Sequence, residues 1–164
     1  MIFSEFVSSS NGDVYQISLS SENDGLLSEY VSQVLAHDGI VILNVELSRV
    51  QGTNPTSGAV LAKIEEVIAN VFLSHPNVMI CYYCDFLSQI PSMRQDLTVQ
   101  EYRSVLFSYM FDRYVTSHHI EHVSQAIATI EGSVENYYVH IIARNEHLHY
   151  VNLIIEHVQR DYGK

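Results

Sequence analysis

Imidazole groups are densest in segment 117–122, which reads Ser-His-His-Ile-Glu-His. His118 and His122 would face the same way if this turn were helical, because positions four apart share one helix face. Two imidazoles can bind zinc, but a zinc site needs a third ligand, and no fixed spacing identifies one. The candidates for it are His140, His147, His149 and Asp85. The segment is thus either part of a divalent metal site, with zinc as the example, or a solvated polar connection after a helix.

The two cysteines form a C-x-x-C motif, Cys81 to Cys84, inside the apolar run 78–84. Redox pairs place this motif at a helix N-terminus, where the first thiol has a lowered pKa. The run is typical of a strand instead, and positions three apart on a strand face opposite sides of the sheet. We therefore expect buried thiols that neither form a disulfide nor share a metal ion.

Two further residues are candidates for binding. Asp85 follows the apolar run directly, at the carboxyl end of the expected strand, where open α/β sheets commonly place functional carboxylates. Tyr109 shares an expected helix with Tyr102 and Tyr114, and this helix has more aromatic surface than one face can bury. Tyrosine is enriched at protein interfaces, so we interpret Tyr109 as part of a partner surface, with core packing as the alternative.

Sequence motifs for nucleophilic or phosphoryl-transfer chemistry are not found. The chain contains no G-x-S-x-G, no P-loop and no G-x-G-x-x-G. We therefore expect a non-catalytic domain without a cofactor.

Composition limits the class of partner. Eight basic and nineteen acidic residues give a formal net charge of −11, which repels phosphate backbones and anionic membranes. The chain has the length of one domain, 164 residues. Its first residues lack a signal-peptide pattern, and no apolar run is long enough to span a membrane, so we expect a cytoplasmic protein without nucleic-acid or membrane partners.

Hydrophobic periodicity predicts the elements. Alternation around Asn11-Gly12 predicts a hairpin over residues 1–20, and segment 123–142 favours a second hairpin, although 123–130 also suits a helix. Strands are expected at 40–47 and 78–84, and helices at 25–37, 59–74, 99–114 and 146–160. The expected helix starts include a T-x-x-E capping box at Thr98 and a cap at Asn145.

These elements predict an α/β (α+β) sandwich of one domain, residues 1–164. Its sheet is mixed and largely antiparallel, with three to four helices packed on it.

The central third resembles a family of small bacterial proteins, found mainly in Bacteroidetes, that has no assigned activity. The resemblance covers residues 58–160 and rests on the strand that ends in Cys84-Asp85 and on the helix Arg103-Ser-Val-Leu-Phe-Ser-Tyr-Met-Phe111. It implies a fold type, a bacterial setting, and Asp85 and Arg103 as matching positions.

Together these features favour a protein-interaction or regulatory domain that self-associates or binds a protein partner. The alternatives are a metal-dependent hydrolase or metal-binding protein that uses His118 and His122, and a small-molecule binding domain, which would need a pocket.

Overall fold

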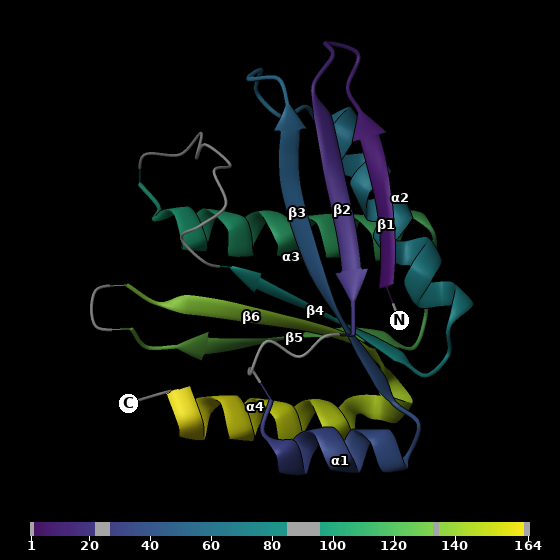
Figure 1. Cartoon of the computed structure of the whole chain (residues 1–164), viewed down its shortest axis with the longest axis vertical. Coiled ribbons are helices and arrows are strands. Elements are labelled where there is room, and N and C mark those ends of the chain that lie inside the picture. The colour runs from purple at the N-terminus through teal and green to yellow at the C-terminus, as the bar shows by residue number, and fades with distance from the viewer. Residues whose placement is uncertain (1, 22–26, 85–95, 133–134, 163–164) are drawn as a thin grey trace.

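The computed structural model describes residues 2–21, 27–84, 96–132 and 135–162 (Figure 1). The described elements, in chain order, are β1 (Ile2–Ser8), β2 (Val14–Ser20), α1 (Glu29–His37), β3 (Val41–Gln51), α2 (Gly58–Ser74), β4 (Val78–Cys84), α3 (Val99–Ser117), β5 (Val123–Ile130), β6 (Tyr137–Arg144), the 3-10 turn η1 (Asn145–His147) and α4 (Leu148–Tyr162).

The strands form one sheet in the order β1-β2-β3-β4-β6-β5. The β3–β4 pair is parallel, and every other neighbouring pair is antiparallel. Helix α2 makes the crossover between the parallel strands, as such a pair requires. The predicted mixed, largely antiparallel sheet with packed helices is confirmed.

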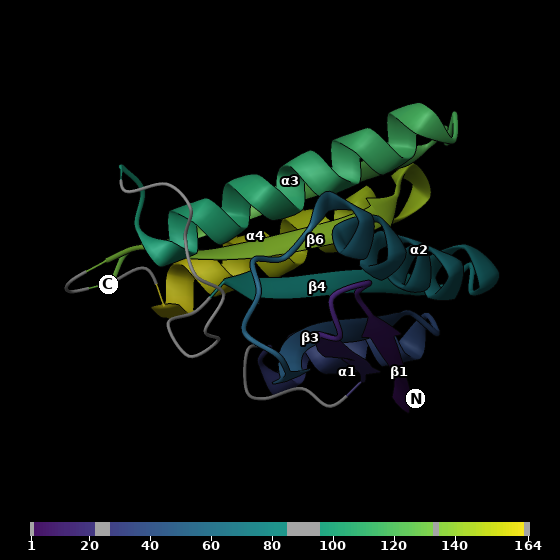
Figure 2. The same cartoon turned by 90° about the horizontal axis from the view of Figure 1, so that it is seen from above.

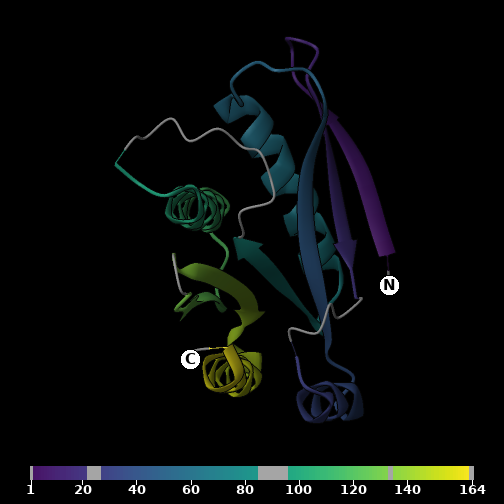
Figure 3. The same cartoon turned by 60° about the vertical axis from the view of Figure 1, so that its left-hand side comes forward.

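The helices form two layers. Buried side chains of α2 and α3 share one apolar cluster with the sheet, and those of α1 and α4 share a second cluster on its opposite face. Figure 2 shows α2 and α3 beside each other above β4, and Figure 3 shows α3 and α4 on opposite sides of β6. The sheet twists strongly, so that β1–β3 stand upright in Figure 1 while β5 and β6 run across the view.

Short polar side chains fix where the helices begin. Ser28, Ser57 and Thr98 each accept a hydrogen bond from a backbone N–H of the first turn. At Thr98 the predicted capping box is complete, because the Glu101 carboxylate also accepts from the Thr98 backbone N–H at 2.9 Å.

Both predicted hairpins are confirmed, including the strand at 123–130. Two helix starts differ from the prediction. The first helix begins at Glu29 rather than near residue 25, because Ser28 caps it, and Tyr30 in its first turn is 66% exposed. Asn145 does not cap the last helix, since its side chain accepts from Ser124 Oγ at 2.7 Å and the chain passes through η1 first.

The two halves of the sheet are covered differently. Helices lie on both faces of the β4–β6–β5 half, whereas the β1–β2–β3 half has α2 on one face and no described helix across most of the other (Figure 3).

In the part of the chain that the structure describes, no helix is long and apolar enough to cross a membrane.

Candidate functional site

Strand β1 forms a sheet edge that carries few of the features that normally block pairing. Its seven residues contain neither proline nor lysine, and Glu5 is its one charged residue. The register with β2 runs without a bulge from Ile2 opposite Ser20 to Ser8 opposite Val14. Natural sheets usually protect such edges with charge, proline or a bulge, so this edge is open to another strand.

The pattern of backbone bonds shows which residues of β1 face outward. The Ser9 N–H donates to the Asp13 carbonyl at 2.8 Å. Ser9 and Asp13 therefore form a hydrogen-bonded pair of the hairpin, with their backbone groups directed toward each other. Such pairs alternate along an antiparallel ladder, so Ile2, Ser4, Phe6 and Ser8 direct their backbone groups away from β2. Lys63 of α2 supports this assignment, because its Nζ donates a hydrogen bond to the Ser8 carbonyl, with 3.2 Å between the two atoms.

Two large apolar side chains on this edge remain in solvent. Ile2 is 72% exposed and Phe6 is 61% exposed. With Ser4 between them, they lie on the sheet face opposite α2, at a part of that face that α1 and α4 do not reach, because successive side chains of a strand alternate between faces. A second strand at this edge would bring its own side chains beside them.

A shallow groove of about 680 Å³ runs along the same edge, between β1 and α2, and Ile2 and Phe6 also line it. Its lining includes Glu5 and Val7 of β1, and Lys63, Val67 and Asn70 of α2. The groove gives an added strand a surface to lie against, in addition to the backbone of β1.

The uncovered sheet face beside the edge is mostly polar. Its cross-strand rows are Ser4–Ser18–Glu46 and Phe6–Gln16–Ser48. Gln16 Nε2 donates to Ser4 Oγ at 3.2 Å, so this face is partly ordered by its own hydrogen bonds. The large exposed apolar side chains of this half are Ile2 and Phe6 on the edge strand and Val50 near the end of β3.

The two predicted binding residues that the structure describes, Arg103 and Tyr109, do not lie together. Asp85 lies outside the described residues. Arg103 is 2% exposed on the inner side of α3, whereas Tyr109 is 60% exposed on the outer side, with the Arg113 guanidinium 5.8 Å from its ring centroid. Arg103 lines an internal cavity and Tyr109 does not.

The helical turn proposed for His118 and His122 does not form. Helix α3 ends at Ser117, His118 is its C-cap, and His119 and His122 have positive φ angles of 51° and 62°. His118 Nδ1 lies 3.0 Å from the Tyr114 carbonyl, and its ring stacks on Tyr114.

The other candidate ligands that the structure describes do not complete a metal site either. His122 lies in solvent, with Nε2 3.8 Å from Glu121. His147, a candidate third ligand, is buried at 7% exposure. No group of three or more metal-binding side chains occurs among the residues that the structure describes.

A buried polar chain that sequence reasoning missed crosses from α3 to β5. His140 is fully buried, with Nε2 2.8 Å from Ser104 Oγ and Nδ1 3.1 Å from Gln125 Nε2. Burial lowers the pKa of His140 to about 4, so the ring is neutral at physiological pH. A neutral imidazole has one donor and one acceptor nitrogen and can therefore bond to both neighbours. The only sequence signal was a histidine inside an otherwise apolar strand.

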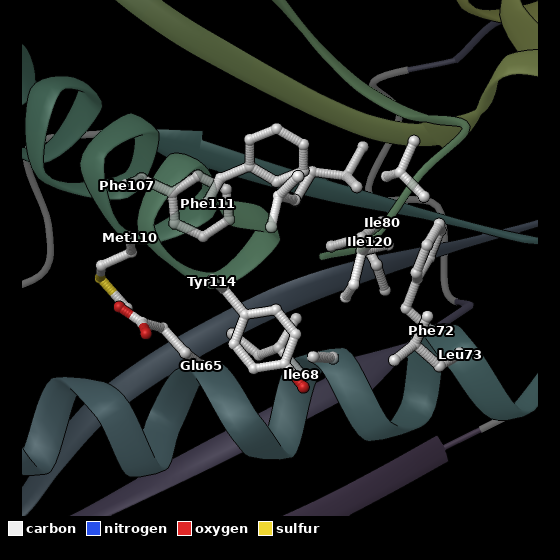
Figure 4. Close-up of a pocket in the computed structure, with 14 residues that line it drawn as sticks. Glu65, Ile68, Phe72, Leu73, Ile80, Phe107, Met110, Phe111, Tyr114 and Ile120 are labelled. Atoms are coloured by element: carbon white, nitrogen blue, oxygen red, sulfur yellow. The ribbon is translucent and has the colours of Figure 1, made fainter. Parts of the chain in front are cut away.

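Two neighbouring cavities lie between α2, α3 and the sheet. The first, of about 60 Å³, is apolar apart from Glu65 and is lined by Phe72, Phe107 and Tyr114 among others (Figure 4). Glu65 accepts at both carboxylate oxygens from Arg113 Nη2, each at 2.6 Å, which joins α2 to α3. The second, of about 160 Å³, lies toward the N-terminal ends of the two helices and contains Arg103 in its lining.

Of the two cysteines, only the side chain of Cys81 is described. Cys81 is buried and reduced, and burial raises the pKa of its thiol to about 12. The expected buried thiol is confirmed at this position.

Comparisons with known proteins return no match to a protein-family model, a curated protein or a solved structure. The resemblance to the Bacteroidetes family stays a prediction, and the function must be inferred from the residues of this chain.

Proposed function

We propose that this chain is a non-catalytic interaction domain that self-associates through β1, as a two-fold dimer whose sheet continues from one subunit to the other. The observation that carries the proposal is the open edge of β1 with its two exposed apolar side chains, Ile2 and Phe6. Addition of a strand at a sheet edge is a common mode of protein recognition, in which backbone hydrogen bonds give affinity and side chains give specificity.

The charge and apolar pattern of β1 selects one pairing register. Centred on Glu5, an antiparallel pair would place two carboxylates directly opposite each other, which is destabilising. Centred on Ser4, the pair places Ile2 opposite Phe6 of the other copy and Ser4 opposite itself, and both apolar side chains are then covered.

The two-fold axis of this register stands perpendicular to the sheet. Both copies of α2 then lie on the same face of the continuous sheet, one on each side of the axis. Each added strand occupies the groove beside Val67 and Asn70 of the other copy. The dimer thus covers apolar surface on both faces of the edge.

Electrostatics oppose this association and give it a recognisable salt dependence. Each chain carries a formal net charge of −11, so the two copies repel each other at low ionic strength. Added salt screens this repulsion. We expect the dimer to become tighter between low and physiological salt.

Sedimentation equilibrium of the wild type and two Ser4 variants tests the proposal. Ser4→Pro removes an outward backbone N–H, and proline is tolerated at an edge strand when that N–H faces away from the sheet. Ser4→Ala is the matched control, because it removes the hydroxyl and keeps the N–H. We expect the wild type and Ser4→Ala to dimerise and Ser4→Pro to be monomeric with an unchanged circular dichroism spectrum.

Two outcomes would overturn the proposal. One is a wild type that stays monomeric at about 1 mM, a concentration at which even weak complexes form. The other is a folded Ser4→Pro variant that dimerises as well as Ser4→Ala.

Disulfide formation tests the register in a Cys84→Ser background. In the Ser4-centred register the two Ser4 Cα atoms lie about 5.5 Å apart, within the range of a disulfide. Ser4→Cys should therefore form covalent dimers on mild oxidation, and Glu5→Cys should not. The reverse pattern would show a Glu5-centred register and refute the charge argument.

A further inference from the structure

The two cavities between α2, α3 and the sheet adjoin along one apolar seam. Ile68, Phe107 and Met110 line both of them (Figure 4). On α2 the combined lining extends from Leu61 to Leu73, which is about 18 Å at the rise of an α-helix. The seam is wide at the N-terminal ends of the two helices, with a cavity of about 160 Å³, and narrow toward their C-terminal ends, with one of about 60 Å³. Its shape therefore suits an elongated ligand.

Of the three side chains at the junction of the cavities, Met110 is the adaptable one. Phe107 stacks on Tyr82 with ring centroids 4.3 Å apart and lies edge-on to His140 at 5.3 Å, so its ring is held from two sides. Ile68 is β-branched and has few rotamers on a helix. A methionine side chain is unbranched and adjusts to irregular gaps. A ligand in the wider cavity can therefore reach the narrower one by moving the Met110 side chain.

Both charged side chains in the described linings already have partners. Glu65 accepts from Arg113, and Arg103 has an interaction of its own. No other described lining residue carries a charge. An ionised ligand would lose its hydration here without a free counter-charge, which is costly. The seam therefore favours a neutral ligand.

The wide end of the seam offers one hydrogen-bond donor. Thr56 Oγ1 accepts from Arg49 Nη2 at 2.8 Å and lies 2.9 Å from the Tyr15 hydroxyl oxygen. One of these two hydroxyl groups donates to the other, and the remaining hydroxyl hydrogen then has no acceptor among the described residues. Tyr15 and Thr56 both line the wider cavity. An oxygen at one end of a ligand can accept this hydrogen.

Hydrogen bonds of the β3–α2 loop hold Thr56 in place. Asn54 donates to the Asp13 carboxylate through its backbone N–H at 3.0 Å and its side chain at 2.9 Å. Gly52 allows this close approach, because its φ angle is +88° and a Cβ would overlap the Asp13 carboxylate. The loop is thus ordered before any ligand binds, which reduces the entropy lost on binding.

We infer that this seam binds a neutral straight-chain alkyl compound with an oxygen at one end. The oxygen accepts from the Tyr15–Thr56 hydroxyl pair, and the chain runs past Met110 toward Phe72. A dry cavity of about 150 Å³ in another protein holds benzene, so the wider cavity has room for about six non-hydrogen atoms and the narrower one for about two more. The inference does not depend on self-association through β1.

Ligand-detected NMR with 1-butanol, 1-hexanol, 1-octanol and 1-nonanol tests the inference. Each methylene added up to about 1-octanol should tighten binding about fourfold, because it leaves water for an apolar lining. The seam is then full, so 1-nonanol should bind no more tightly than 1-octanol. Octanoate is the ionised comparison and should bind about tenfold more weakly than 1-octanol.

Two variants locate the two ends of the chain. Leu61→Trp fills the wider cavity from a half-buried position on α2 and should weaken binding of every alcohol. Ala69→Leu fills the narrower cavity and should leave 1-butanol unaffected while it removes the gain from 1-hexanol to 1-octanol. Tyr109→Ala, which alters the exposed side of α3, is the control that should bind like the wild type.

Four results would each overturn the inference. They are no binding of 1-octanol at about 1 mM, an undiminished gain from 1-octanol to 1-nonanol, octanoate that binds as tightly as 1-octanol, and a folded Ala69→Leu variant with the wild-type dependence on chain length. The first three use the wild type alone, so they decide the question even if neither cavity-filling variant folds.

Discussion

The two halves of the sheet differ in what covers them. In the β4–β6–β5 half, α3 packs on one face and α4 on the other, and core residues such as Met79, Val139 and Ile141 are at most 1% exposed. In the β1–β2–β3 half, α2 covers one face, and the opposite face leaves Ile2 and Phe6 in solvent. The same sheet is thus a closed core at one end and leaves large apolar side chains exposed at the other, where we propose self-association.

The largest expected effect is a loss of stability in the covered half. Ile154 is 1% exposed on α4, so Ile154→Ala should leave a cavity and cost about 3 kcal/mol of unfolding free energy. Phe6→Ala in the open half should cost less than about 0.5 kcal/mol in the monomer, since its side chain is already in solvent. Urea unfolding of both variants at low protein concentration measures the difference, and equal losses would remove the distinction between the halves.

His140 should make the covered half sensitive to acid. Its folded-state pKa of about 4 lies below the value of about 6.5 for an unfolded chain. The stability it contributes is therefore complete above about pH 6.5 and is lost progressively as the pH falls toward 4, by about 3 kcal/mol in total. Unfolding free energies measured across this range should show the slope in the wild type and a flatter profile in His140→Gln. A wild-type profile that is flat from pH 6.5 to 4.5 would contradict the buried neutral ring.

The ion pair between Glu65 and Arg113 links the helices of the two halves. Arg113→Ala leaves the Glu65 carboxylate, whose side chain is 7% exposed, without this partner. We expect a cost of about 1–2 kcal/mol, smaller than for a fully buried pair because Arg113 is partly in solvent. In a double-mutant cycle the second change, Glu65→Gln, should recover part of the loss. Strict additivity of the two single changes would show that the pair contributes nothing.

The smallest expected effect on stability comes from the cysteine substitutions. Their clear effect should be on how fast each thiol is alkylated. Burial raises the pKa of Cys81 to about 12, so its thiolate is scarce at neutral pH. In a Cys84→Ser background, alkylation of Cys81 should be far slower than alkylation of a cysteine placed at exposed Ser48 in the open half. Mass spectrometry of timed samples measures both rates, and similar rates would mean that the covered half opens readily.

Much of the fold could be predicted from local patterns. The alternation of Tyr15, Ile17 and Leu19 against their polar neighbours determined the first hairpin, because one face of it is buried against α2. The apolar run 78–84 indicated a central strand, and the Thr98 capping box indicated the start of α3. These features depend on residues close together in the sequence.

Features that depend on distant residues could not be predicted. Nothing near His147 indicates that it is buried, and Asn145 had the right type for a cap but bonds to Ser124 on β5 instead. The open edge of β1 follows from the strand order, which local periodicity does not contain. The cavity at Arg103 results from the packing of α2, α3 and three strands. The sequence therefore indicated Arg103 but not the residues that surround it.

Amide hydrogen exchange at several protein concentrations tests the central claim, pairing of β1 with a second copy, most directly. The outward N–H groups of Ser4 and Phe6 should be protected above the dimer dissociation constant and exchange quickly below it. The outer edge of β5, at the other end of the sheet, serves as the internal reference and should not change with concentration. Concentration-independent exchange at Ser4 and Phe6, or equal changes at both edges, would contradict the account.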